Sequence, residues 1–133
     1  MKKTLILSAL TVLCLVSCHK KYEEKAGTFS GYEVYIRVPY DDQNDTLDFD
    51  IVAANYTLTY NKNNKSYSVT SSTGNISNIQ FDRDDFKDNQ AESGSVLSFS
   101  TWYVSLEGNS FTATYEDFDF NELEAWSFEG DKN

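Results

Sequence analysis

Residues 47–60, LDFDIVAANYTLTY, contain the pattern that decides the fold. Apolar and polar side chains alternate with a period of two, which is typical of a β-strand with one buried face. The apolar positions are odd-numbered as far as Ala53 and even-numbered from Ala54 onward. Such a change of phase within one run indicates a bulge, a sharp bend or two separate strands.

The same alternation extends along the chain on both sides of this stretch. It predicts a first strand with one face in the core, built from the apolar set Tyr32, Val34, Ile36, Val38 and Tyr40. Shorter alternating segments follow, and the one over 96–106 also changes phase. Residues 82–95 are the one stretch that could hold a short helix, with a structured loop as the alternative.

Seven or eight short strands joined mostly by tight turns predict an all-β domain. We expect a single small antiparallel β-barrel, because strands with a mid-strand phase change must bend as barrel strands do. A two-layer β-sandwich is the alternative fold.

The first eighteen residues, MKKTLILSALTVLCLVSC, have the layout of an export signal. Two lysines precede an apolar run that is too short to span a membrane. Leu15-Val16-Ser17-Cys18 resembles the lipobox of bacterial lipoproteins, with an ordinary signal peptide as the alternative. That resemblance implies cleavage before Cys18 and lipid on its sulfur, and two or three acyl chains give stable membrane anchoring.

This resemblance divides the chain into three expected parts. Residues 1–17 are a removed signal peptide, 18–27 a lipidated cysteine with a polar tether, and 28–133 the all-β domain. The expected location is the envelope of a Gram-negative bacterium, in the outer membrane. Lys21-Tyr22-Glu23-Glu24 loosely resembles signals that send lipoproteins to the cell surface, which leaves surface exposure as an open alternative.

Composition excludes several kinds of chemistry in the expected domain. The formal net charge is −10, and becomes −12 once Lys2 and Lys3 leave with the signal. Nucleic acid is therefore not an expected partner. Cys14 leaves too and Cys18 carries lipid, so disulfides and thiolate sites are excluded. The one histidine, His19, lies beside the anchor, which excludes a catalytic triad in the domain.

The strand pattern weakly resembles the small lipocalin-like (calycin) domains of bacterial lipoproteins. Gly27-Thr28-Phe29 lies where that family has a glycine followed by an aromatic residue entering the first strand. The resemblance implies a barrel that takes a ligand at its mouth. Aromatic side chains outside the apolar phase, or ambiguous in it, are the candidate ligand-binding residues: Tyr35, Trp102, Tyr103 and Trp126.

Acidic loops are the other candidate sites. The spacing of Asp117, Asp119 and Asn121 makes them weak calcium candidates, against the simpler interpretation of solvated turns. No other cofactor is expected. A carboxylate pair of a hydrolase is a remote alternative, because a domain of this size has little room for a substrate cleft.

Two function hypotheses follow. The first is a non-enzymatic envelope lipoprotein that captures a small apolar molecule, a glycan or a peptide at the barrel mouth. The second is an envelope accessory or inhibitor protein that acts through surface loops or a sheet edge and has no internal pocket.

Overall fold

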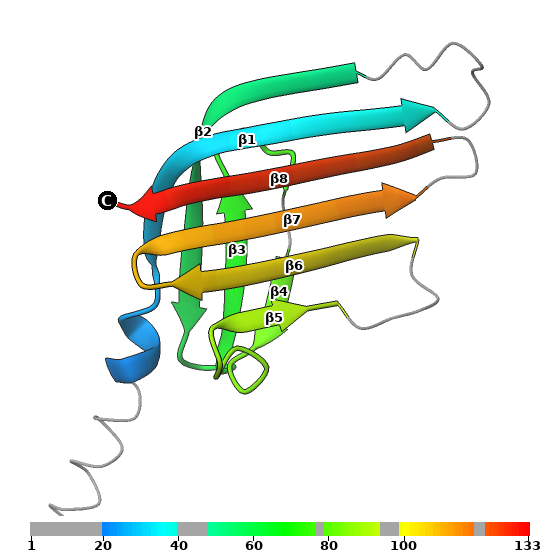
Figure 1. Ribbon diagram of the computed structural model, residues 1–133. Helices are drawn as coiled ribbons and strands as arrows, with labels where there is room; N and C mark the ends of the chain where they lie inside the picture. The colour runs from blue at the N-terminus through cyan, green and yellow to red at the C-terminus, as the bar shows by residue number, and fades with distance from the viewer. Residues whose placement is uncertain (1–19, 40–47, 77–78, 94–98, 119–121) are drawn as a thin grey trace, which may run out of the picture.

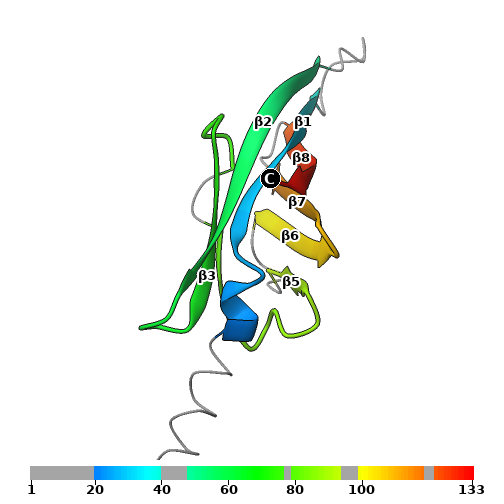
Figure 2. The same cartoon turned by 90° about the vertical axis from the view of Figure 1, so that its left-hand side faces the viewer.

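The computed structural model describes residues 20–39, 48–76, 79–93, 99–118 and 122–133. These residues form one antiparallel sheet in the order β4-β3-β2-β1-β8-β7-β6-β5. The sheet curls into a nearly closed barrel, so the predicted all-β barrel is confirmed (Figures 1 and 2). Its strands are β1 (Gly27–Pro39), β2 (Asp48–Asn61), β3 (Ser66–Ser71), β4 (Ile79–Asp82), β5 (Gln90–Glu92), β6 (Ser100–Glu107), β7 (Ser110–Phe118) and β8 (Glu122–Lys132).

The barrel interior is filled by aromatic side chains. The rings of Tyr56 and Phe128 stack with centroids 3.9 Å apart, and those of Phe29 and Phe111 with centroids 4.9 Å apart. All four side chains are fully buried. Close packing of this kind leaves no room for a ligand in the middle of the barrel.

The long strands β1 and β2 pair without interruption from Gly27↔Leu58 to Arg37↔Asp48. The phase change at Ala53 therefore marks neither a bulge nor a second strand, and β2 is one strand that bends (Figure 1). Ala54, Tyr56 and Leu58 face the core as predicted.

The predicted facing of the far halves of β1 and β2 is wrong. Tyr32 is 65% exposed, Phe49 57% and Ile51 52%, whereas Glu33 is 1% exposed. The reason is that these halves extend past the packed core. Their concave face lines the open end of the barrel with polar groups, and their convex face has no covering layer within the described residues.

The N-terminal segment closes the other end of the barrel. Residues 20–23 form one helical turn, and the Tyr67 hydroxyl donates a hydrogen bond to the Tyr22 carbonyl oxygen at 2.8 Å. The Lys25 ammonium donates to the Phe86 carbonyl oxygen at 2.8 Å and lies over the Phe86 ring. The described part of the expected tether therefore packs against the domain rather than hanging free.

Residues 83–88 form turns, so this segment is the predicted loop and not the short helix. Phe86 from this loop is fully buried in the barrel end. In the described part of the chain, no helix has both the length and the apolar character needed to cross a bilayer.

Two glycines allow β1 and β8 to approach closely where the sheet bends. Gly31 pairs with Gly130, and a Cβ atom on Gly31 would lie 2.0 Å from the Glu129 carbonyl oxygen. A Cβ atom on Gly130 would lie 2.6 Å from the Ser30 carbonyl oxygen. Backbone atoms cannot move aside as side chains can, so both positions require glycine.

We predict that Gly31→Ala lowers the free energy of unfolding by about 3 kcal/mol, because the new methyl group overlaps backbone atoms of β8. Gly27→Ala on the same strand is the control. Its Cβ would meet only the flexible end of Lys132, so we expect a change of less than about 1 kcal/mol. Urea denaturation measures both, and equal stability of the two variants would contradict the close approach.

Candidate ligand-binding site at the barrel mouth

The open end of the barrel collects polar and aromatic side chains from three adjacent strands. We call this set the mouth: Glu33, Tyr35 and Arg37 from β1, Asp48 and Asp50 from β2, and Glu122, Glu124 and Trp126 from β8. It lies at the far end of β1 from the N-terminal turn (Figure 1). Period-two alternation places every β1 member on the concave face.

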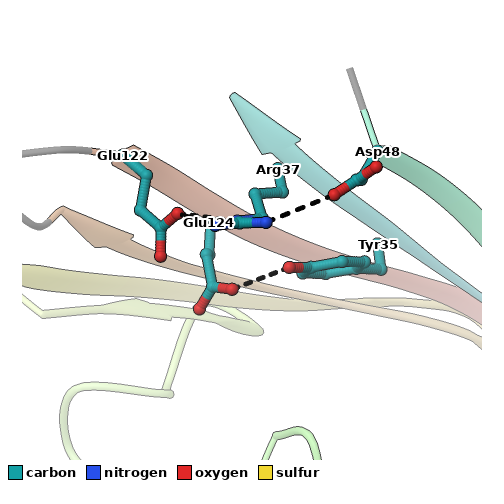
Figure 3. A network of polar contacts seen from close by, with 5 residues as sticks. All are labelled: Tyr35, Arg37, Asp48, Glu122 and Glu124. Atoms are coloured by element: carbon teal, nitrogen blue, oxygen red, sulfur yellow. Dashed lines mark hydrogen bonds and ion pairs between the residues drawn. The ribbon is translucent and has the colours of Figure 1, made fainter. Parts of the chain in front are cut away.

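Tyr35 and Trp126 form the aromatic wall of the mouth. They are cross-strand partners, and their ring centroids lie 5.2 Å apart. The Tyr35 hydroxyl donates a hydrogen bond of 2.7 Å to Glu124 (Figure 3). Burial, followed by this hydrogen bond, raises the pKa of Tyr35 to about 12. The phenol is therefore neutral at physiological pH, and its ring position is fixed by Glu124.

Arg37 joins three strands at the rim. Its guanidinium donates to Glu122 on β8 at 2.6 Å and lies 3.4 Å from an Asp48 carboxylate oxygen on β2 (Figure 3). Glu122 raises the pKa of Arg37, followed by Asp48. These exposed pairs contribute little stability. Their effect is to neutralise two of the mouth carboxylates and hold the rim in one geometry.

Glu33 forms the floor of the mouth. Its carboxylate accepts hydrogen bonds from the Tyr56 hydroxyl, from the Thr73 hydroxyl at 2.8 Å and from the Asn75 amide at 2.6 Å. Thr73 and Asn75 belong to the loop after β3, so Glu33 fastens that loop to the barrel wall. Burial raises the pKa of Tyr56, and the bond to Glu33 raises it further. A buried acid with several donors is satisfied without a basic partner.

Part of the mouth lines an open pocket of about 310 Å³. Its charged lining is entirely acidic, and the Asp50 carboxylate has no hydrogen bond or ion pair within the described part of the chain. The lining residues are Glu33, Tyr35, Asp50, Val52, Asn75 and Trp126.

The structure brings together two of the four predicted aromatic candidates, Tyr35 and Trp126. Trp102 is half-buried and packs on Phe81 with ring centroids 5.6 Å apart. It is the cross-strand partner of Tyr115, which in turn contacts Trp126. Trp102 is therefore linked to Trp126 through Tyr115, but it does not line the pocket. Tyr103 lines a separate surface hollow beside β5.

Sequence reasoning missed the polar members of the site, above all Glu33, Asp50 and Asn75. Glu33 and Asp50 alternate with apolar residues and therefore resemble solvent-facing positions of ordinary strands, while Asn75 lies in a polar stretch that resembles an ordinary turn. The sequence carries no signal that would find the two acids, because an outward-facing acid and an inward-facing acid have the same sequence pattern. Only the neighbouring strands distinguish them.

The calcium candidates remain a prediction. Asp117 is exposed near the end of β7, while Asp119 and Asn121 lie outside the described residues. Among the residues that the structure describes, no group of three metal-binding side chains is found.

Comparisons of the chain with protein-family models, with curated proteins and with solved structures found no match. The functional interpretation therefore depends on the chemistry of the mouth itself.

We predict that Glu33→Leu lowers the free energy of unfolding by about 2–3 kcal/mol, because the Tyr56, Thr73 and Asn75 donors lose their common acceptor. Glu33→Gln should cost less than half as much, since the hydroxyls can accept from its amide. Urea denaturation measures both. Glu129→Leu, on the exposed side of β8, is the control and should change stability little. Wild-type stability of Glu33→Leu would show that the floor network is unimportant.

Proposed function

We propose that the protein is a non-enzymatic binding lipoprotein, anchored through Cys18 in the outer membrane of a Gram-negative bacterium. In this proposal the mouth captures a ligand that carries a positively charged group. The observation that carries it is the pocket of about 310 Å³, which joins the faces of Tyr35 and Trp126 to an Asp50 carboxylate that has no partner among the described residues.

The chemistry of the pocket favours a cation over other ligands. Carboxylates attract a positive group directly, and tyrosine and tryptophan faces attract it through their ring quadrupoles. Arg37 is the one cation among the mouth residues, and it is already paired with Glu122 and Asp48. The net charge of −12 without the expected signal peptide adds a long-range attraction for the same kind of ligand.

A small apolar ligand fits this site less well. The barrel core is filled by Phe29, Tyr56, Phe111 and Phe128, so the space that a lipocalin-like barrel would use is occupied by side chains. The open pocket above them has two carboxylates and an amide in its wall. An apolar molecule would have to desolvate these polar groups without satisfying them.

The position of the anchor supports the same proposal. Cys18 precedes Lys20 by two positions, and the turn that begins at Lys20 packs against the end of the barrel opposite the mouth (Figure 1). A lipid on Cys18 would therefore hold the packed end near the bilayer. The mouth would face away from the membrane, where a soluble ligand can reach it.

We predict that Cys18→Ser abolishes membrane association, because the sulfur that would carry lipid is lost. Cell fractionation followed by immunoblotting measures the distribution. Cys14→Ser is the matched control and should leave the protein in the membrane fraction, since residue 14 lies in the expected signal. Retention of the Cys18→Ser protein in the membrane would remove the lipoprotein part of the proposal.

We predict that the mouth binds N-acetyl-arginine amide with a Kd of about 1 mM and binds the uncharged citrulline analogue at least about tenfold more weakly. Tryptophan fluorescence measures this binding. Trp126→Phe should remove most of the signal, and Asp50→Asn should weaken binding. If a soluble chitin fragment gave the response and the arginine probe did not, the ligand class would be a glycan and the cation proposal would be wrong.

A further inference from the structure

The half of β2 that borders the mouth has an open edge. Strand β3 pairs with β2 only over Tyr56–Asn61. At Asn55 the loop after β3 makes the last contacts, where Ser72 donates its amide to the Asn55 carbonyl oxygen at 2.8 Å. Beyond this point β2 pairs with β1 alone, and nothing in the described chain bonds to its other side from Asp48 to Ala54.

No described residue bonds to the backbone groups at this edge. Successive residues of a strand direct their N–H and C=O groups to opposite sides. Since Asn55 directs both groups toward the β3 side, Phe49, Ile51 and Ala53 direct theirs toward the open edge. This open edge is longer than β4 or β5, the two short strands at the ends of the sheet. Short edge strands resist pairing with other chains, whereas a long one invites it.

The side chains along the edge differ between its two faces. On the convex face, the exposed side chains of Phe49 and Ile51 lie opposite Ile36 and Val34 of β1. On the concave face lie Asp48 and Asp50, and Asp50 also lines the mouth pocket. A strand added here would therefore place alternate side chains over an apolar surface and into an acidic one.

We propose that this edge accepts an extended peptide segment of another protein in which basic side chains alternate with apolar ones. The segment adds a strand beside β2, and its main chain bonds to Phe49, Ile51 and Ala53. One of its basic side chains enters the mouth pocket beside Asp50, Tyr35 and Trp126. This inference rests on the proposed function and names the ligand of the same site.

The charges of the edge argue for a basic partner and against a second copy of this chain. Two copies paired along this edge would bring their own Asp48 and Asp50 side chains to one face of a joined sheet. Each copy, without the expected signal peptide, would also add a net charge of −12. Like charges on neighbouring strands destabilise the pairing, whereas lysine or arginine at the same positions stabilises it.

The test uses the full-length protein in detergent and a fluorescent peptide as long as the open edge, in which lysine alternates with valine. Fluorescence polarisation measures the Kd. We expect this peptide to bind at least about tenfold more tightly than the single-residue arginine probe, because it gains main-chain hydrogen bonds. A peptide with glutamate in place of lysine should not bind.

Backbone methylation separates strand pairing from simple charge attraction. In an extended peptide, the valine N–H groups point to one side and the lysine N–H groups to the other. Methylation of one set must therefore block pairing with β2, while methylation of the other leaves it intact. We expect one isomer to bind like the parent and the other to lose about tenfold or more in affinity. The valine isomer fails if the peptide runs antiparallel to β2, and the lysine isomer if it runs parallel.

A pair of protein variants gives the matching test. Ile51→Pro removes an edge N–H that β1 does not use, so it should weaken peptide binding while the barrel remains folded. Ile51→Ala keeps that N–H and should bind the peptide more tightly than Ile51→Pro. Neither change should affect binding of the single-residue arginine probe, which needs only the mouth.

The outcomes are distinguishable. Equal affinity of the two methylated isomers, or equal affinity of Ile51→Pro and Ile51→Ala, would overturn edge pairing even if the arginine probe binds. Failure of the unmodified protein to bind the arginine probe would instead overturn the proposed function. A peptide-free dimer on sedimentation that Ile51→Pro dissociates would identify a second copy as the occupant and would refute the proposal.

Discussion

The close approach of β1 and β8 at Gly31 and Gly130 is the constraint on which the rest of the structure depends. Ala54 of β2 is the partner of Gly31 on the other side, so small residues lie side by side on three strands where the sheet bends. On one side of this row the sheet closes around aromatic rings. On the other side the same strands continue as an open wall. One steric condition therefore creates both the packed core and the mouth.

The division of the sheet into two halves explains why the concave face of β1 carries an apolar side chain near its start and polar side chains farther along. Phe29 of β1 is fully buried against Phe111, whereas Glu33, also on the concave face, meets polar donors from the loop after β3. The loop has no other close attachment to β1 among the described contacts, so the carboxylate holds the floor of the mouth in place. Stability and site geometry are thus coupled through Glu33, and a substitution there alters both.

Period-two alternation was sufficient to predict an all-β barrel with about the right number of strands, because alternation is a property of the strand itself. It did not predict which face of β1 and β2 is buried beyond the bend, since facing depends on what covers the sheet. Tyr32 and Ile51 look like core residues in sequence and are exposed, while Glu33 looks like a surface residue and is buried. Tyr35 was a predicted ligand-binding candidate because it is an aromatic outside the apolar phase, and Trp126 because its phase is ambiguous. No sequence pattern around Tyr22 predicts that it packs against the barrel end.

The pairing of Arg37 decides which carboxylate remains for a ligand. Its guanidinium is already bound to Glu122 and Asp48 at the rim, and Glu124 accepts the Tyr35 hydroxyl. Asp50 is left without a partner in the described chain, next to the aromatic wall and on the strand whose edge is open. In the proposed complex, a cationic side chain at Asp50 has no ion pair with a described residue to break. The main chain of the same peptide lies within reach of β2 backbone groups that no described residue bonds. In the proposed complex the pocket and the edge act as two parts of one binding surface, and the rim pairs of Arg37 hold the mouth in one geometry.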